Sequence, residues 1–219
     1  MVSFEQVKHD PAIREYIKSA DSALKALGYT EHSFAHAEKA VVVCEYILTT
    51  LGADERTVEI AKIAAFMHDI GNLVNRVDHS QSGAVMSFRI LDKMGMDPAE
   101  IALIVAAIGN HDEGTGVPVN EIAAALILAD KSDVRRSRVR NADVSSFDIH
   151  DRVNYSVTRS ELQINDNKDE ITLILEVDTR YSSVMDYFEI FMQRMLLCRK
   201  AADRLGMKFH LQINGQILL

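Results

Sequence analysis

Residues 63–71, Ile-Ala-Ala-Phe-Met-His-Asp-Ile-Gly, combine an apolar helical run with a polar end. The first five side chains are apolar, which is typical of a buried helix. His68 and Asp69 follow at once. Because burial of an imidazole and a carboxylate without a partner is costly, we expect a partner for both. A metal ion satisfies the two groups together, since neutral imidazole and carboxylate are common metal ligands.

Helical signals extend from this stretch in both directions. Ser3 and Gln6 have capping-box spacing, Asp54 is a capping residue, and Asp10-Pro11 and Asp97-Pro98 each pair a cap with a first-turn proline. Apolar residues recur between these signals at intervals of three and four, as on one face of a helix. Besides a short helix after Ser3, we expect helices over residues 11–27, 30–51, 55–67, 80–94, 98–108 and 119–134.

The pattern changes after Asn141. We expect a helix over 147–157, a hairpin of strands 161–164 and 171–177, a long helix over 183–205 and a third strand over 208–213. The fold class is therefore mainly α. Residues 1–140 are predicted to form a helical metal-binding domain, and residues 141–219 a small C-terminal β-β-α-β module.

Composition narrows the range of partners. The chain has 219 residues and a net charge of −8, which argues against an extended nucleic-acid or anionic membrane surface. No segment approaches the ~20 apolar residues that cross a bilayer. The first ten residues contain no apolar run like that of a signal peptide. We therefore expect a cytoplasmic protein that acts on a small molecule.

Two further residues join His68 and Asp69 as candidate ligands. His36 lies between Ala35 and Ala37 on an amphipathic helix, and Asp130 interrupts the apolar run 122–129. Three separate helices thus offer metal-ligating groups. His-Asp also occurs at positions 9, 111 and 150, so the dipeptide alone is weak evidence. Capping at Asp10 and a solvated helix around His150 explain two of these copies.

The candidate ligands follow one another in a fixed order: His36, then His68-Asp69 within Phe-Met-His-Asp-Ile-Gly, then Asp130 after Leu128-Ala129. In this ordered pattern the chain resembles the HD superfamily of metal-dependent phosphohydrolases. The resemblance covers roughly residues 30–140. It implies an HD-type helical bundle in which these four residues bind a first divalent ion. It also implies that Asp69 and His68 belong to the catalytic centre, with Asp69 able to bridge to a second ion.

Two segments resemble the two-metal members of that superfamily. His79 stands at a predicted helix start, and His111 follows a helix on a glycine-rich loop. Histidines in such places ligate the second ion in those members. The alternative is that His79 only caps its helix and His111 is an exposed loop residue. The ligand types suit Mn, Fe, Mg, Ni, Co or Zn without choosing among them.

Substrate contacts are expected next to the ligands. Many members have lysine after His-Asp-Ile-Gly, where this chain has Asn72, an uncharged amide that can still donate to a phosphate oxygen. A basic cluster follows Asp130 and could bind phosphate or simply favour a helix C-terminus: Lys131, Arg135, Arg136, Arg138 and Arg140. Asp133 could orient a ligand histidine, but we do not expect it to. His32 shares a face with His36 and is predicted to be a surface residue, with a peripheral contact to substrate or to a ligand as the alternative.

The resemblance implies a phosphomonoesterase, phosphodiesterase or nucleotide pyrophosphohydrolase that uses metal-activated water, with a nucleotide as the expected substrate. Two other functions stay open. Some HD members are di-iron oxygenases, and the ligand set is compatible with that chemistry. The protein could also be a non-catalytic nucleotide or metal sensor, whose C-terminal module could mediate a homodimer.

Overall fold

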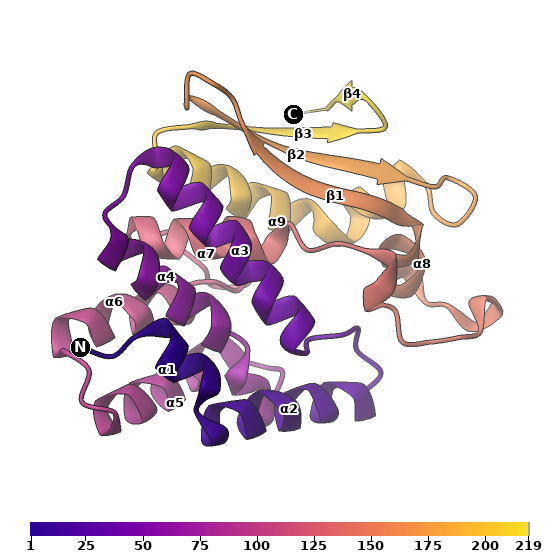
Figure 1. The fold of residues 1–219 in the computed structure, drawn as a ribbon. Coiled ribbons are helices and arrows are strands. Elements are labelled where there is room, and N and C mark those ends of the chain that lie inside the picture. Colours follow the sequence, from indigo (N-terminus) through magenta and orange to yellow (C-terminus); the bar gives the residue numbers. More distant parts are fainter. Residues whose placement is uncertain (219) are drawn as a thin grey trace.

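The computed structural model describes residues 1–218, and its first half is helical (Figure 1). The bundle consists of α1 (Phe4–His9), α2 (Pro11–Ala26), α3 (Phe34–Leu51), α4 (Glu55–Met67), the 3-10 turn η1 (Ile70–Leu73), α5 (His79–Lys93), α6 (Pro98–Gly109) and α7 (Glu121–Lys131). The mainly helical fold predicted from the sequence is confirmed. Short turns η2 (Arg136–Arg138) and η3 (Val144–Ser146) lead to α8 (Ile149–Ser156).

Local capping explains most of these boundaries. The side chain of Asp10 accepts hydrogen bonds from the backbone N–H groups of Ala12 and Ile13, so α2 begins at Pro11. Capping also explains why α3 and α7 begin later than the predicted residues 30 and 119. Ser33 caps α3 and Asn120 caps α7, so these helices begin at Phe34 and Glu121.

The C-terminal part contains β1 (Val157–Ile164), β2 (Glu170–Val177), α9 (Val184–Arg204), β3 (Lys208–Ile213) and β4 (Gln216–Ile217). The sheet has the order β1-β2-β3-β4, antiparallel except between β2 and β3. The predicted β-β-α-β order is confirmed, and β4 is an addition. The predicted helix over 147–157 ends at Ser156, because Val157 already pairs with Val177.

Helix α9 lies between the sheet and the helical bundle, where it packs on α7 and on β3 (Figure 1). Buried apolar side chains form one continuous cluster that runs from Val2 to Ile213. The two predicted domains therefore share a core, and the boundary at residue 140 stays a prediction. This shared core fixes the position of α9 relative to the end of α7, which carries Asp130.

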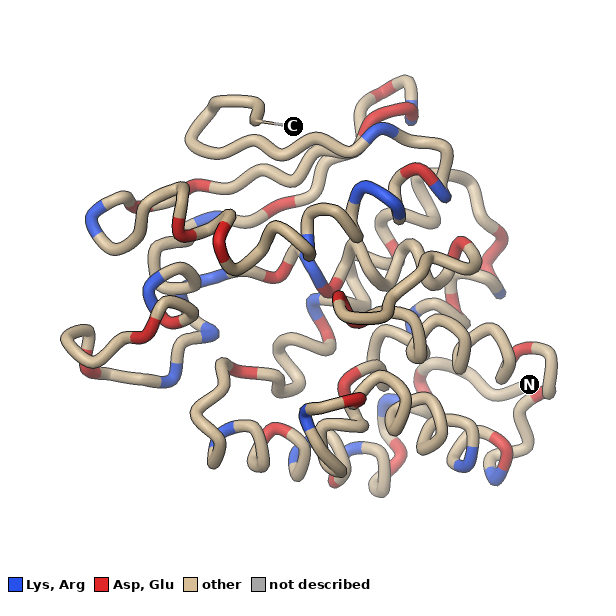
Figure 2. The backbone as a smooth tube through the Cα atoms, turned by 180° about the vertical axis from the view of Figure 1, so that it is seen from behind, with Lys and Arg blue, Asp and Glu red and all other residues tan. Residues whose placement is uncertain are grey.

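Positions of both charge signs are interspersed over the backbone (Figure 2). None of the helices formed by residues 1–218 combines the length and apolarity that crossing a bilayer requires. The cytoplasmic location and the homodimer stay predictions.

Candidate metal centre and its cavity

Helix α4 delivers His68 and Asp69 to the interior. Its last residues before them, Ile63 to Met67, are all buried, and they fix the end of the helix inside the bundle. His68 is fully buried, and its Nδ1–H donates to the carbonyl of Ala65 at 2.7 Å. Because a carbonyl only accepts, the neutral ring carries its proton on Nδ1 and its lone pair on Nε2.

The ring of His36 faces that of His68 and has the same tautomer. The Nδ1–H of His36 donates to Oδ2 of Asp133 at 2.8 Å, so its Nε2 also carries a lone pair. The two Nε2 atoms lie 3.2 Å apart. Oδ1 of Asp130 lies 3.2 Å from Nε2 of His36, and Oδ2 of Asp69 lies 3.3 Å from Nε2 of His68. Four ligand atoms thus converge on one point, from α3, from the two residues that follow α4 and from α7.

A second group of ligand atoms faces the other oxygen of Asp69. His79 and His111 donate Nδ1–H to the carbonyls of Arg76 and Ile108, at 3.1 and 2.6 Å. Their Nε2 atoms lie 3.2 Å apart. Oδ1 of Asp69 is 3.5 Å from Nε2 of His79 and 4.0 Å from Nε2 of His111. Asp69 therefore stands between two histidine pairs, with one oxygen toward each.

A close backbone approach holds these two groups together. A Cβ atom on Gly71 would lie 2.0 Å from the carbonyl oxygen of His79 and 2.4 Å from the backbone nitrogen of Gly83. Only glycine therefore allows η1 to contact the first turn of α5. This contact places His79 beside Asp69, although seven residues of chain separate Gly71 from His79.

The electrostatics of the first group favour a cation. Oδ2 of Asp69 is buried and has no hydrogen-bond partner in residues 1–218. Burial opposes protonation of His68, but Asp69 and Asp130 outweigh it and raise its pKa to about 9. The carboxylates thus stabilise positive charge where the imidazole lone pairs meet. A divalent ion supplies that charge and removes the repulsion between the lone pairs.

The second group is equally suited to a cation. Burial lowers the pKa of His111 to about 3, so its ring stays neutral and its Nε2 stays available at neutral pH. Burial also lowers the pKa of His79. His36, His68 and Asp130 offer atoms within 4.8 Å of one another, as do His68, Asp69 and His111. The second of these sets shares His68 with the first and does not include His79, which approaches Oδ1 of Asp69 at 3.5 Å and Nε2 of His111 at 3.2 Å. The residues present therefore fit a divalent ion at the first group and offer further ligand atoms beside it.

Asn72 is buried and forms hydrogen bonds to Asp69. Its amide donates to Oδ1 of Asp69 at 2.8 Å and to the Asp69 carbonyl at 3.0 Å. Arg76 donates to the Asn72 side-chain oxygen at 3.3 Å. Asn72 therefore orients the carboxylate that faces both groups, and the residues that line the adjoining cavity do not include it. Its expected contact with substrate stays a prediction.

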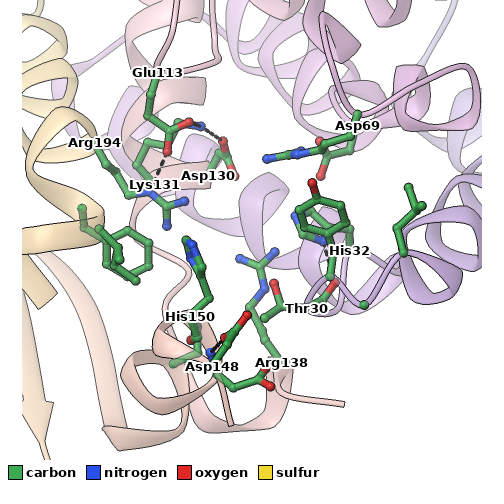
Figure 3. Close-up of a pocket in the computed structure, with 18 of the residues that line it drawn as sticks. Thr30, His32, Asp69, Glu113, Asp130, Lys131, Arg138, Asp148, His150 and Arg194 are labelled. Atoms are coloured by element: carbon green, nitrogen blue, oxygen red, sulfur yellow. Dashed lines mark hydrogen bonds and ion pairs between the residues drawn. The ribbon is translucent and has the colours of Figure 1, made fainter. Parts of the chain in front are cut away.

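A cavity of about 540 Å³ opens beside Asp69 and Asp130 (Figure 3). Lys131 lines it, with Nζ 2.7 Å from Oδ2 of Asp130 and 3.0 Å from Oε2 of Glu113. Burial lowers the pKa of Lys131, but these two carboxylates more than compensate and raise it, so the ammonium group is charged. Lys131 thus lies beside the centre, and its expected contact with substrate stays a prediction.

The structure places Arg135 and Arg136, two other cations of the predicted cluster, differently. Arg135 donates to Asp133 at 2.8 Å and to Glu31 at 2.9 Å. Arg136 donates to the carbonyl of Tyr155 at 2.6 Å, and its guanidinium lies over the Tyr155 ring. Neither arginine is among the residues that line the cavity. Their assignment to substrate binding stays a prediction that this geometry does not support.

Several residues at the site have no signal in the sequence motif. Asp133 orients His36, which corrects our expectation that it would not. His32, predicted to be a surface residue, forms part of the cavity wall with its ring 5.5 Å from that of His36. The remaining cations of the wall come from η2, α9 and the segment before α5: Arg138, Arg194 and Arg76. Arg138 belongs to the basic cluster that follows Asp130 in the sequence, whereas spacing alone cannot find Arg194 and Arg76, because tertiary packing brings them in.

A match to a known protein family agrees with this geometry. Residues 29–152, more than half of the chain, match the HD domain family. The uncharacterized protein MJ1020 of Methanocaldococcus jannaschii is 24% identical over 189 residues, which cover 75% of this chain and 72% of that protein. The crystal structure of a predicted HD superfamily hydrolase from an uncultured Thermotogales bacterium has a TM-score of 0.44 and 25% identity, and covers 60% of this chain and 73% of its own.

Proposed function

Because the chain belongs to the HD domain family, we propose that it is a metal-dependent phosphohydrolase that cleaves a phosphate ester or anhydride, with a nucleotide as substrate. The observation that carries this proposal is the placement of Asp69. Its two oxygens face separate histidine pairs, and Oδ2 has no other partner in residues 1–218. A carboxylate in this position could serve both ligand groups, and two divalent ions, if bound, would supply the chemistry of two-metal hydrolysis.

The ligands would be His36, His68, Asp69 and Asp130 for one ion, and Asp69, His79 and His111 for the other. When bound, divalent ions supply an activated water near neutral pH and stabilise charge on phosphoryl oxygens. The chain's own groups orient the centre. Asp133 fixes the ring of His36, and Asn72 fixes Asp69.

The size and the lining of the cavity support a nucleotide as the substrate. Its volume of about 540 Å³ is in the usual range for small-molecule sites. Near the centre its wall is cationic, with Lys131 and Arg138. The wall also contains the aromatic rings of Tyr29 and Phe191 and polar groups on or next to α8, namely Asp148, His150, Asp151 and Asn154. Rings and hydrogen-bonding groups of this kind suit a base and a sugar.

The direct test couples elemental analysis of the purified protein to a phosphate-release screen over a panel of nucleotides. We expect one or two divalent ions per chain and release of phosphate or pyrophosphate from at least one nucleotide. Iron together with oxygen consumption, and no phosphate release, would identify an oxygenase instead. Tight nucleotide binding with no product after long incubation with metal would identify a sensor.

A variant separates the centre from the rest of the fold. Asp69→Ala removes the carboxylate shared by both ligand groups, so we expect loss of bound metal and of phosphate release while the helical circular dichroism is kept. Asp166→Ala is the control, because Asp166 is an exposed turn residue. Retained turnover in Asp69→Ala contradicts the mechanism.

A further inference from the structure

Arg194 connects the C-terminal part of the chain to the cavity. It lies on α9, outside residues 29–152 that match the HD domain family. Its Nε donates to Oε1 of Glu113 at 2.8 Å, and its guanidinium lies 4.1 Å from the centre of the Phe191 ring. Because the bond to Glu113 and the ring contact fix the plane of the guanidinium, its direction is set before any ligand binds.

Glu113 joins Arg194 to the metal centre. Its second oxygen, Oε2, accepts from Nζ of Lys131 at 3.0 Å, and Lys131 contacts Asp130 at 2.7 Å. The contacts therefore run without a break from a ligand carboxylate to α9. This chain of contacts fixes the position of Arg194 relative to Asp130.

Arg138 faces the same space from another side. Its Nε and Nη1 donate to the carbonyls of Glu31 and Asp133, at 2.9 and 2.7 Å, and the residue is buried. These carbonyls orient the guanidinium, whose Nη1 also lies 3.8 Å from Oδ2 of Asp133. Figure 3 shows the side chains of Arg138, Arg194 and His150 pointing toward the middle of the cavity, opposite Asp69.

The charge balance around the cavity indicates what this space binds. The cavity wall contains four cations, Lys131, Arg76, Arg138 and Arg194, and five carboxylates, Asp69, Asp130, Glu113, Asp148 and Asp151. The carboxylates outnumber the cations by one. A bound divalent ion would therefore leave the wall net positive, and an oxyanion would restore the balance.

We propose that Arg194, together with Arg138, binds the phosphoryl group of the substrate, so that α9 completes a site whose ligands all come from the helical bundle. The proposal rests on the proposed function for the identity of the oxyanion. Two guanidinium groups held in different orientations can donate to several phosphoryl oxygens at once. The C-terminal part thereby acquires a role in substrate binding.

Inorganic phosphate is the probe, and isothermal titration calorimetry of the full-length, Mn²⁺-loaded protein measures its Kd. Arg194→Gln is expected to weaken phosphate binding about 10- to 100-fold, the range for loss of charged hydrogen bonds. Arg194→Lys keeps the charge but loses the planar fork, so we expect binding several-fold weaker than in the wild type. Arg199→Gln, an exposed position on the same helix, is the matched control and should leave Kd unchanged.

Phosphate binding by Arg194→Gln with the wild-type Kd, or no binding by the wild type, overturns the proposal. If Arg194→Gln does not fold, Arg194→Lys decides, and a wild-type Kd in that variant overturns it as well. Failure of the proposed function looks different. A wild-type protein that binds phosphate through Arg194 but hydrolyses no nucleotide contradicts the hydrolase and leaves the anion site in place.

Discussion

Oδ2 of Asp133 lies 2.8 Å from Nδ1 of His36, and both side chains are buried. The bond sets the tautomer of His36 and aims its Nε2 at Asp69 and Asp130. Asp133 is itself held by Arg135 and Arg138, at 2.8 and 3.8 Å. A ligand on α3 is thus oriented by residues that follow α7.

Removal of this contact should weaken metal binding without unfolding the chain. In Asp133→Asn the side chain no longer offers a charged acceptor, so His36 is less well oriented, and we expect about 10- to 100-fold weaker metal affinity. Competition with a fluorescent chelator measures it. Asp166→Asn makes the same chemical change at an exposed position and should not alter affinity. Equal affinity in the two variants would mean that Asp133 has no orienting role.

The Gly71 contact predicts a steric effect. In Gly71→Ala the new Cβ would meet the backbone of His79 and Gly83, so η1 and α5 must separate. We expect a loss of about 3 kcal/mol in the free energy of unfolding, at the upper end of the range for overpacking. Urea denaturation measures it.

Gly109→Ala is the matched control for this substitution. Its Cβ would have its nearest neighbour at 3.7 Å, an ordinary contact, and Gly109 ends a helix. We expect unchanged or slightly increased stability. A loss at Gly109 as large as that at Gly71 would show that the close approach is not the cause.

Chelation should destabilise the folded protein, because the ligand groups converge only after folding. An ion that binds the native state alone adds about 2.7 kcal/mol of stability at a free concentration of 100 Kd. Thermal melts with excess Mn²⁺ and with EDTA measure the difference. Asp69→Ala should melt at the same temperature in both conditions. A chelator effect of wild-type size in that variant would place the bound metal elsewhere.

The ion pair between Arg56 and Glu100 joins α4 to α6 and predicts a pH dependence. Nε of Arg56 donates to Oε1 of Glu100 at 2.6 Å, and hydrogen bonding to Arg56 lowers the pKa of Glu100 below its ordinary 4.5. A depressed carboxyl pKa stabilises the fold above pH 4.5, and this stabilisation is lost as the pH falls below that value.

We therefore expect wild type to be more stable than Glu100→Gln at pH 7, with the difference shrinking below pH 4.5. Urea denaturation of both proteins across this range measures it. A difference that stays constant through the acidic range would show that the pair does not control this part of the acid response.

Most helices could be predicted because their signals are local. The caps at Asp10, Asp54 and Asp97 act within one turn, so their position in the sequence is their position in the structure. Strand β4 could not be predicted, since its two residues pair only with β3 and carry no periodic pattern of their own. The start of α7 was misplaced by two residues because Asn120, a better cap than its neighbours, was overlooked.

The sequence by itself identified the candidate ligand residues, whose role in metal binding stays a prediction. His36, His68, Asp69 and Asp130 stand out because polar groups interrupt apolar helices, and the structure brings these four together with His79 and His111. Only the tertiary structure decided which other side chains surround the candidate ligands. The orienting role of Asp133 and the entry of Arg194 depend on contacts between α3, α7 and α9, which are distant in sequence and meet because they share one core.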